Sequence, residues 1–402
     1  MPALSVRAPS AFALALFWLG VQAVWGALLG ISLQSRTIEL SAGNALIAYG
    51  RLATLGALVA ALTQVAIGFW SDARRRRASR RVEFYVAGAV GGAVTLACFY
   101  GARTFFELTV AFIALQATLN VAIGPYQAII PDFVERERTG AASSWMAALQ
   151  GAGNAVGALA ASFIVNARAL GASLGALLLA TCAITVSHAS RVPLRDAPAT
   201  QGPRFRATRA FVDLFISRAL VYVGFYTLLG YLLFYVTDVL GVTSLANARR
   251  ETGILIVAFT LLGAAGAAVA ARPSDRLDKR LVATLGAASF IAALGVFIAS
   301  HGMPGVALAT LLAGLGWGVF LVADWAIACR VLPPAAMAAA MGIWNLAIVL
   351  PQIVAPALTT FVVQRLGTFG PQAPRVAFGL ALGETFVGIA WLWRLSRCTI
   401  EE

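Results

Sequence analysis

The first part of the chain contains a long stretch without any charged residue, between Arg7 and Arg36. As a helix, at about 1.5 Å per residue, this stretch is long enough to cross the roughly 30 Å hydrocarbon core of a bilayer. A secretory signal peptide has an apolar core of only about 7–15 residues followed by a cleavage site of small residues, so this stretch is too long for one. The sequence therefore predicts a helix that spans a membrane.

Further apolar stretches of similar length follow along the whole chain. They lie near residues 44–70, 82–101, 105–130, 141–166, 169–187, 210–236, 252–270, 281–300, 304–328, 337–362 and 376–393. Charged residues make up only 12% of the sequence, whereas soluble domains hold about 25%. The alternating segments of about ten residues that build a membrane β-barrel do not occur in the sequence. We therefore predict an all-α membrane protein of twelve transmembrane helices.

The longest polar segment of the chain, Ser187–Arg209, divides six predicted helices from six. It predicts an N-terminal six-helix bundle over residues 1–187, a cytoplasmic linker over 188–209 and a C-terminal six-helix bundle over 210–402. Residues of the first half recur in the second at nearly one offset. The recurring pairs are Gly20 and Gly224, Gly26 and Gly230, Asp72 and Asp275, and Ala128-Ile129 and Ala326-Ile327. Many secondary transporters consist of duplicated halves with a substrate site near the middle of the membrane, so we expect two pseudo-symmetric bundles.

The net charge of +13 could indicate a nucleic-acid partner, but its placement along the chain argues against one. If both termini are cytoplasmic, most of the 30 basic residues fall in cytoplasmic segments. This is the positive-inside pattern of membrane proteins, in which arginines record topology and contact anionic lipid headgroups. We predict a multi-pass protein of the bacterial inner membrane with both termini in the cytoplasm, and no nucleic-acid partner.

No pattern in the sequence is typical of an enzyme or of a cofactor site. The four cysteines have no metal-ligand spacing, and no nucleophile–base set or phosphate-binding loop is present. We expect no enzymatic activity, no metal and no cofactor.

Two loops at equivalent positions of the halves have similar sequences. They read Gly68-Phe-Trp-Ser-Asp72-Ala-Arg-Arg-Arg76-Arg77 and Ala271-Arg-Pro-Ser-Asp275-Arg276-Leu-Asp-Lys-Arg280. Both resemble the G-x-x-x-D-R-x-G-R-R loop of the major facilitator superfamily. The resemblance implies the fold of that superfamily and a latch on one conformation, with Asp72, Arg76, Asp275 and Arg276 as gating residues. A plain cytoplasmic anchor is the alternative. The loops depart from the pattern at Ala73, Arg75, Ala271 and Asp278.

Other stretches resemble a narrower group within that superfamily. They include Gly20-Val-Gln22-Ala-Val-Trp25-Gly, Gln64-Val-Ala-Ile-Gly68-Phe-Trp70, Asn120-Val-Ala-Ile-Gly124-Pro125-Tyr126-Gln127 and Met341-Gly342-Ile-Trp344-Asn345. They are similar to the sucrose/proton symporters and their bacterial relatives in the glycoside–pentoside–hexuronide group, which implies a sugar substrate. Those symporters have an arginine tied to coupling where this chain has Gln127, so proton coupling stays open.

Amide and aromatic side chains within the predicted helices are the candidates for substrate binding. Amides pair with sugar hydroxyls, and aromatic rings cover the apolar face of a sugar. The candidates are Gln22, Trp25, Asn120, Gln127, Gln150, Asn154, Tyr222, Tyr226, Trp344, Asn345 and Gln352. Each buried amide has an alternative role in holding helices together.

Ionisable side chains within membrane spans are candidates for coupling or gating. Asp324 lies near the cytoplasmic end of its predicted helix and is expected to lock a gate by pairing with Arg330 or a loop arginine; a proton carrier is the alternative. Glu384 lies mid-span and is either a proton site or a structural residue. For Arg218, near a helix end, snorkelling of the side chain to the interface explains the charge.

These features together predict a secondary active transporter that moves a small solute, a sugar or glycoside, by alternating access. Proton coupling is left open. An exporter of amphipathic or drug-like compounds and a non-transporting assembly or pigment-delivery protein are the alternatives. The expected partners are a small-molecule substrate, membrane lipids and, if coupling holds, protons, and we expect a monomer.

Overall fold

The computed structural model describes the chain except residues 1–9, 76–80, 135–138, 194–206, 332–336 and 396–402, and except some side chains next to these gaps. The described residues are almost entirely helical and divide into two compact units. Unit 1 comprises Met1–Ser41 and Leu55–Ala199, and unit 2 comprises Ala42–Thr54 and Thr200–Glu402. Each unit is described by itself.

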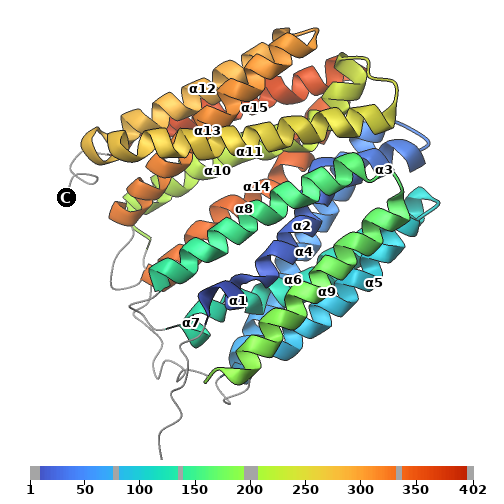
Figure 1. The fold of residues 1–402 in the computed structure, drawn as a ribbon. Helices are drawn as coiled ribbons and strands as arrows, with labels where there is room; N and C mark the ends of the chain where they lie inside the picture. Colours follow the sequence, from blue (N-terminus) through green and yellow to red (C-terminus); the bar gives the residue numbers. More distant parts are fainter. Residues whose placement is uncertain (1–9, 76–80, 135–138, 194–206, 332–336, 396–402) are drawn as a thin grey trace, which may run out of the picture. The chain divides into compact units, whose positions relative to one another are not determined.

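Unit 1 begins with a segment of successive short helices that together form one candidate membrane span, Ala11–Leu40. Its elements are α1 (Ala11–Ala15), α2 (Phe17–Ala27), the π-helix η1 (Leu28–Ser32) and α3 (Leu33–Leu40). The remaining elements are α4 (Ala45–Arg75), α5 (Val82–Gly101), α6 (Phe105–Tyr126), α7 (Ile129–Phe133), α8 (Thr139–Phe163) and α9 (Ala167–Arg191). The first residues of α4 belong to unit 2. Within unit 1, α2 packs against both α8 and α9, and α5 packs against both α6 and α9 (Figure 1).

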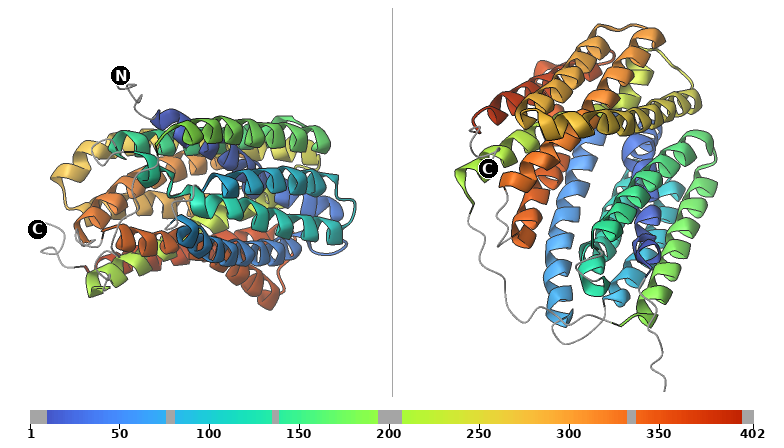
Figure 2. Two further views of the ribbon diagram at one scale, coloured as in Figure 1. Left: turned by 90° about the horizontal axis from the view of Figure 1, so that it is seen from below. Right: turned by 60° about the vertical axis from the view of Figure 1, so that its left-hand side comes forward.

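Unit 2 is built from six long helices and a π-helical turn. These are α10 (Arg209–Phe234), η3 (Tyr235–Val239), α11 (Leu245–Arg276), α12 (Lys279–Ala299), α13 (Met303–Val331), α14 (Met337–Leu366) and α15 (Gln372–Leu392). The helix α13 packs against α11 and α12, while α10 packs against α14 and α15 (Figures 1 and 2). The two π-helical turns η1 and η3 fall at the same place in the two repeats, near the end of the first helix of each.

The predicted all-α membrane class is confirmed. Eleven helices in the described part of the chain are long and apolar enough to cross a membrane, among them Val82–Gly101, whose bounds match the predicted span. The predicted span near 141–166 is present as α8, a helix of 25 residues. The polar residues Gln150 and Asn154 lie within it.

Polar side chains fix where several helices begin. Thr104 accepts a hydrogen bond from the Glu107 backbone N–H at 3.2 Å, and Asn166 accepts one from Ala169 at 3.0 Å. Such N-caps satisfy backbone donors that have no partner within the helix. In unit 2, Thr208 caps α10 and Asp278 caps α12 in the same way.

Gly20 and Gly224, one of the two glycine pairs predicted to mark the repeat, make equivalent contacts in the two units. A Cβ atom added at Gly20 on α2 would lie 3.0 Å from Leu178 Cα on α9. One added at Gly224 on α10 would lie 2.8 Å from the carbonyl oxygen of Ala381 on α15. In both units a glycine lets the first helix of the repeat approach the last one closely, because it has no side chain. The internal repeat inferred from the sequence therefore corresponds to a repeated packing contact.

Candidate solute-binding and gating residues

The centre of unit 2 contains a buried ion pair between Arg218 of α10 and Asp324 of α13. The two side chains are only 3% and 4% exposed. Arg218 lies nine residues after Arg209, the first residue of α10, which is about 13 Å into the helix at 1.5 Å per residue. The guanidinium is therefore inside the unit, and snorkelling to the interface, as expected from the sequence, is wrong.

Asp324 was expected to pair with Arg330 or a loop arginine, but its partner is Arg218. Helical periodicity explains the difference, because Asp324 belongs to the buried face of α13, which also holds Phe320 and Ile327. A buried aspartate needs a cation with the same burial, and Arg218 is the arginine that α10 places against it. A proton-carrier role for Asp324 is not required to explain its burial, because the ion pair already compensates its charge.

Aromatic rings surround the Arg218 guanidinium. Its Cζ lies 3.6 Å from the ring centroid of Trp344 and 4.9 Å from that of Tyr222. One of its nitrogens also donates a hydrogen bond to the Tyr222 hydroxyl at 3.3 Å. Desolvated cation–π contacts of this kind are worth about 2 kcal/mol. The arginine is thus held from three sides, by a carboxylate, a hydroxyl and the face of an indole.

Further candidates lie beside this cluster. Gln352 of α14 donates a hydrogen bond to the Tyr226 hydroxyl at 2.9 Å, and the ring centroids of Tyr226 and Tyr222 are 6.2 Å apart. Trp317, which the sequence did not single out, stacks on Phe225 with a centroid separation of 4.2 Å. The structure therefore brings together four predicted residues of unit 2, Tyr222, Tyr226, Trp344 and Gln352. The side chain of Asn345 lies outside the described residues.

The amides of unit 1 form a different arrangement. Gln64 of α4 donates to the Asn120 side-chain oxygen at 2.6 Å, and the Asn120 amide donates to the Gln116 carbonyl oxygen at 2.7 Å. Asn120 is 2% exposed. These bonds favour the alternative role for Asn120, which is to join α4 and α6. Gln127 is exposed at the C-terminal end of α6.

The remaining unit 1 candidates lie on α2 and α8, which pack together. A Cβ atom added at Gly153 of α8 would lie 2.8 Å from Gln22 Cβ, so Gln22 is at this helix contact. Gln22, Trp25 and Gln150 are half-buried, and Asn154 is exposed. Their backbones are therefore brought near one another, although no side-chain hydrogen bond joins them in the described part of the chain.

Most of the predicted loop gating residues have side chains outside the described residues. Arg76 and the side chains of Asp72 and Asp275 lie outside the described residues, and Arg276 is exposed at the last residue of α11. The described part shows instead an ion-paired arginine at the start of the helix that follows each loop. Arg81, the N-cap residue of α5, places its Nε 3.0 Å from a carboxylate oxygen of Asp132 in α7.

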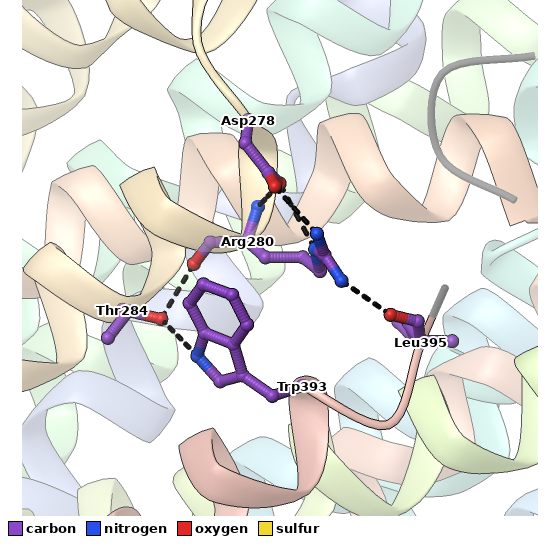
Figure 3. Close-up of polar contacts among 5 residues, drawn as sticks. All are labelled: Asp278, Arg280, Thr284, Trp393 and Leu395. Atoms are coloured by element: carbon purple, nitrogen blue, oxygen red, sulfur yellow. Dashed lines mark hydrogen bonds and ion pairs between the residues drawn. The ribbon is translucent and has the colours of Figure 1, made fainter. Parts of the chain in front are cut away.

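The corresponding arginine of unit 2 is Arg280, at the start of α12. It donates to both carboxylate oxygens of Asp278 and, at 2.6 Å, to the carbonyl oxygen of Leu395 (Figure 3). The ring of Trp393 lies 5.0 Å from its guanidinium carbon, and the Trp393 indole donates to Thr284 at 3.0 Å. Sequence reasoning missed Arg81 and Arg280, although both are the last arginine of the loop, directly at the start of the next helix.

Glu384 lies on the buried face of α15. It is 8% exposed, and neither of its carboxylate oxygens has a hydrogen-bond partner among the described residues. It takes no part in the Arg218 cluster.

Comparison with known proteins assigns the family. A family model described as Major Facilitator Superfamily matches residues 10–249 and 214–398. The chain belongs to the major facilitator superfamily. The fold predicted from the twin loops is thereby confirmed, whereas the narrower sucrose-symporter group is not. No match was found among the curated proteins.

Several solved structures of transporters have a similar fold. A bacterial homologue of the human lysosomal transporter Spinster, in an inward-facing and occupied conformation, is 15% identical, with a TM-score of 0.72 over 96% of this chain and 95% of that one. The nucleoside transporter NupG is 13% identical, with a TM-score of 0.71 over 96% and 99% of the two chains. A bacterial metal transporter is 14% identical, with a TM-score of 0.64 over 96% of each chain. At these identities the likeness shows the fold alone.

Proposed function

We propose that this major facilitator protein is a secondary active transporter of a small sugar or glycoside, which it moves across the bacterial inner membrane by alternating access. Both termini lie in the cytoplasm in this proposal, and the protein acts as a monomer. The observation that supports the substrate class best is the arrangement of Tyr222, Tyr226 and Gln352 beside the Arg218–Asp324 pair.

The charge of this cluster favours an uncharged solute. Arg218 and Asp324 neutralise each other, and their burial makes it costly to expose either charge to a second ion. The polar groups that remain are hydroxyl and amide groups, those of Tyr226 and Gln352. Such groups pair with the hydroxyls of a sugar, and the neighbouring aromatic rings suit a flat or apolar sugar face.

Two of the structural neighbours bear on the choice of test compounds. NupG is a nucleoside transporter, and a nucleoside is chemically a glycoside, so nucleosides belong among the candidates. Another neighbour is a metal transporter. In the described part of this chain no group of three or more His, Cys, Asp or Glu residues could hold a metal ion, so this structure gives no support to a metal cargo.

The proposal is tested by counterflow in proteoliposomes. Full-length protein is reconstituted into vesicles loaded with an unlabelled monosaccharide, disaccharide or nucleoside, and entry of the same labelled compound is followed. Counterflow needs no ion gradient, so it detects transport whatever the coupling. We expect exchange of at least one compound. If none exchanges while the reconstituted protein is folded, the substrate class is wrong.

The two alternative functions predict different results in expression, counterflow and purification experiments. An exporter of amphipathic compounds confers resistance to such compounds on expression and gives no sugar or nucleoside counterflow. An assembly or pigment-delivery protein co-purifies with a membrane complex and shows neither activity.

A further inference from the structure

We propose that Glu384 is a proton-binding site in the middle of the membrane and that it couples transport to the proton gradient. This inference rests on the transport function proposed above and adds the coupling ion to it. It is carried by the position of Glu384 along α15, by its burial and by the absence of a partner among the described residues.

The position of Glu384 follows from contacts at the two ends of α15. At one end Arg375 donates to the carbonyl oxygen of Ser300, which directly follows α12, at 3.2 Å. At the other end Trp393 donates to Thr284, near the start of α12 (Figure 3). Glu384 is equally far in sequence from Arg375 and Trp393, and about 13 Å of helix separates it from each at roughly 1.5 Å per residue. It therefore lies near the middle of a hydrocarbon core of about 30 Å.

The face of α15 that contains Glu384 packs on an apolar stripe of α10. Ala381 and Thr385 lie against Gly224, and a Cβ atom added at Gly388 would lie 3.0 Å from both Leu220 and Val221. Glu384 is one helical turn from Ala381 and from Gly388, on the same buried face. This part of α10 offers no charged side chain to it.

The carboxyl group of Glu384 has no partner in the part of the chain that the structure describes. Glu384 is 8% exposed, both its oxygens are buried, and neither accepts a hydrogen bond from the described residues. No described ion pair includes it. An ionised carboxylate in such a place costs several kcal/mol, and the group avoids this cost by binding a proton.

The charged and titratable groups of the neighbouring elements are engaged elsewhere or lie at the helix ends. On the packed elements they are Arg209, Asp213, Arg218, Tyr222, Tyr226 and Tyr231 of α10, Tyr235 and Asp238 of η3, Lys279 and Arg280 of α12, and Arg365 of α14. Asp213 accepts a hydrogen bond from Trp391, and Arg218 is paired with Asp324. Tyr231 and Tyr235 donate to the carbonyl oxygens of Pro356 and Phe297. Lys279 is the first residue of α12, at the end where Trp393 binds.

The proton balance is simple. The carboxylate takes up one proton when its surroundings are hydrated on one side of the membrane, and the neutral acid is the form compatible with the buried state described here. Release of the proton on the other side restores the carboxylate. The solute-loaded protein crosses with Glu384 neutral and buried, and the empty protein returns with the carboxylate ionised and hydrated, so one proton is carried with each solute.

The test separates the proton site from transport itself. Wild-type, Glu384→Gln and Glu384→Asp proteins are reconstituted at full length. Each is assayed for counterflow, and for accumulation of the exchanging sugar or nucleoside under an inward proton gradient. We expect Glu384→Gln to keep counterflow but to lose accumulation down to passive equilibration, and Glu384→Asp to restore accumulation at least in part. Glu107→Gln, which removes an exposed carboxylate in the first turn of α6, is the matched control and should accumulate normally.

A second readout needs no substrate. Infrared difference spectra of the reconstituted protein during a pH titration detect the carbonyl band of a protonated, buried carboxylic acid. We expect this band in the wild type, a shifted band in Glu384→Asp and its loss in Glu384→Gln. Accumulation by Glu384→Gln at the wild-type level, or an unchanged band in that variant, would overturn the proposal. Absence of counterflow in the wild type overturns the proposed sugar or nucleoside substrate instead, while the infrared result still tests proton binding.

Discussion

The guanidinium carbon of Arg218 lies 3.6 Å from the ring centroid of Trp344, so the arginine of α10 is covered by an indole of α14 while it forms an ion pair with Asp324 of α13. Three helices of unit 2 therefore meet at one charged group. A cluster of this kind links their positions, since none of the three can move alone without exposing a buried charge or an aromatic face.

This linkage predicts a strong coupling between the two charged residues. Replacing Arg218 by Met leaves the Asp324 carboxylate buried without its partner. Replacing Asp324 by Leu leaves the Arg218 guanidinium buried without its partner. Each variant should destabilise unit 2 by about 3–5 kcal/mol. The double variant leaves no uncompensated charge and should be more stable than either single one. Thermal unfolding of the purified proteins in detergent measures all four members of the cycle.

The same cycle shows whether Arg218 and Asp324 interact in the folded protein. Additive losses, with the double variant as unstable as the sum of the single ones, would mean that the two residues do not interact. Arg272→Gln is the control, because Arg272 is exposed on α11, and its stability should equal that of the wild type.

The hydrogen bond between Gln352 and Tyr226 should matter for transport more than for stability. Tyr226→Phe removes the hydroxyl, keeps the ring and costs about 1 kcal/mol of folding free energy. If this hydroxyl pairs with substrate, the variant should raise the concentration needed for half-maximal counterflow. Tyr231→Phe is the matched control on the same helix, because its hydroxyl donates to Pro356 at 3.4 Å and serves packing. Equal effects of the two variants on counterflow would argue against a substrate role for Tyr226.

Much of this fold could be predicted from the sequence because charged residues mark the ends of the membrane spans. Val82–Gly101 was predicted to the residue, since arginines precede it and Arg103 follows it. The repeated glycines Gly20 and Gly224 were also informative, because a close helix contact tolerates only a small residue. The interruption of the first span by η1 could not be predicted. It occurs where Ser32 accepts a hydrogen bond from Tyr100, a contact with another helix.

The candidate site was less predictable, because its chemistry depends on which helix faces meet. The role of Arg218 requires Asp324, 106 residues later, and neither neighbourhood in the sequence indicates the other. The amide of Asn120 could equally bind a sugar or another helix, and only its bonds to Gln64 and Gln116 favour the latter. The type of a polar residue could thus be recognised from the sequence, whereas its partner could not.

The close contact between Gly224 and α15 predicts that a Gly→Val substitution destabilises the protein at this position but not at an open position of α15. Gly224→Val places side-chain atoms where the Ala381 carbonyl lies and should separate α10 from α15, with a loss of several kcal/mol and of folded yield. Gly379→Val is the matched control within α15, because nothing lies within 4 Å of a Cβ atom there. Size-exclusion chromatography and thermal unfolding compare the two. Similar behaviour of both variants would contradict close packing at Gly224.

The contacts of Arg280 predict how the end of α15 is held. Arg280→Gln removes the bond to the Leu395 carbonyl and the ring contact with Trp393, but the backbone N–H at this position still donates to Asp278 and still caps α12. A hydrogen bond from a charged donor contributes about 1.5–3 kcal/mol, so the loss should be of this size and confined to one end of α15.

Hydrogen–deuterium exchange locates that loss. In Arg280→Gln the backbone amides of residues 391–395 should exchange faster than in the wild type, while those around Glu384 keep their protection, because the packing of Gly224 and Gly388 is unchanged. Asp278→Ala should add faster exchange at the first turn of α12, since it removes the cap as well as the partner of Arg280. Unchanged exchange over 391–395 in Arg280→Gln would show that α15 is held by helix packing alone.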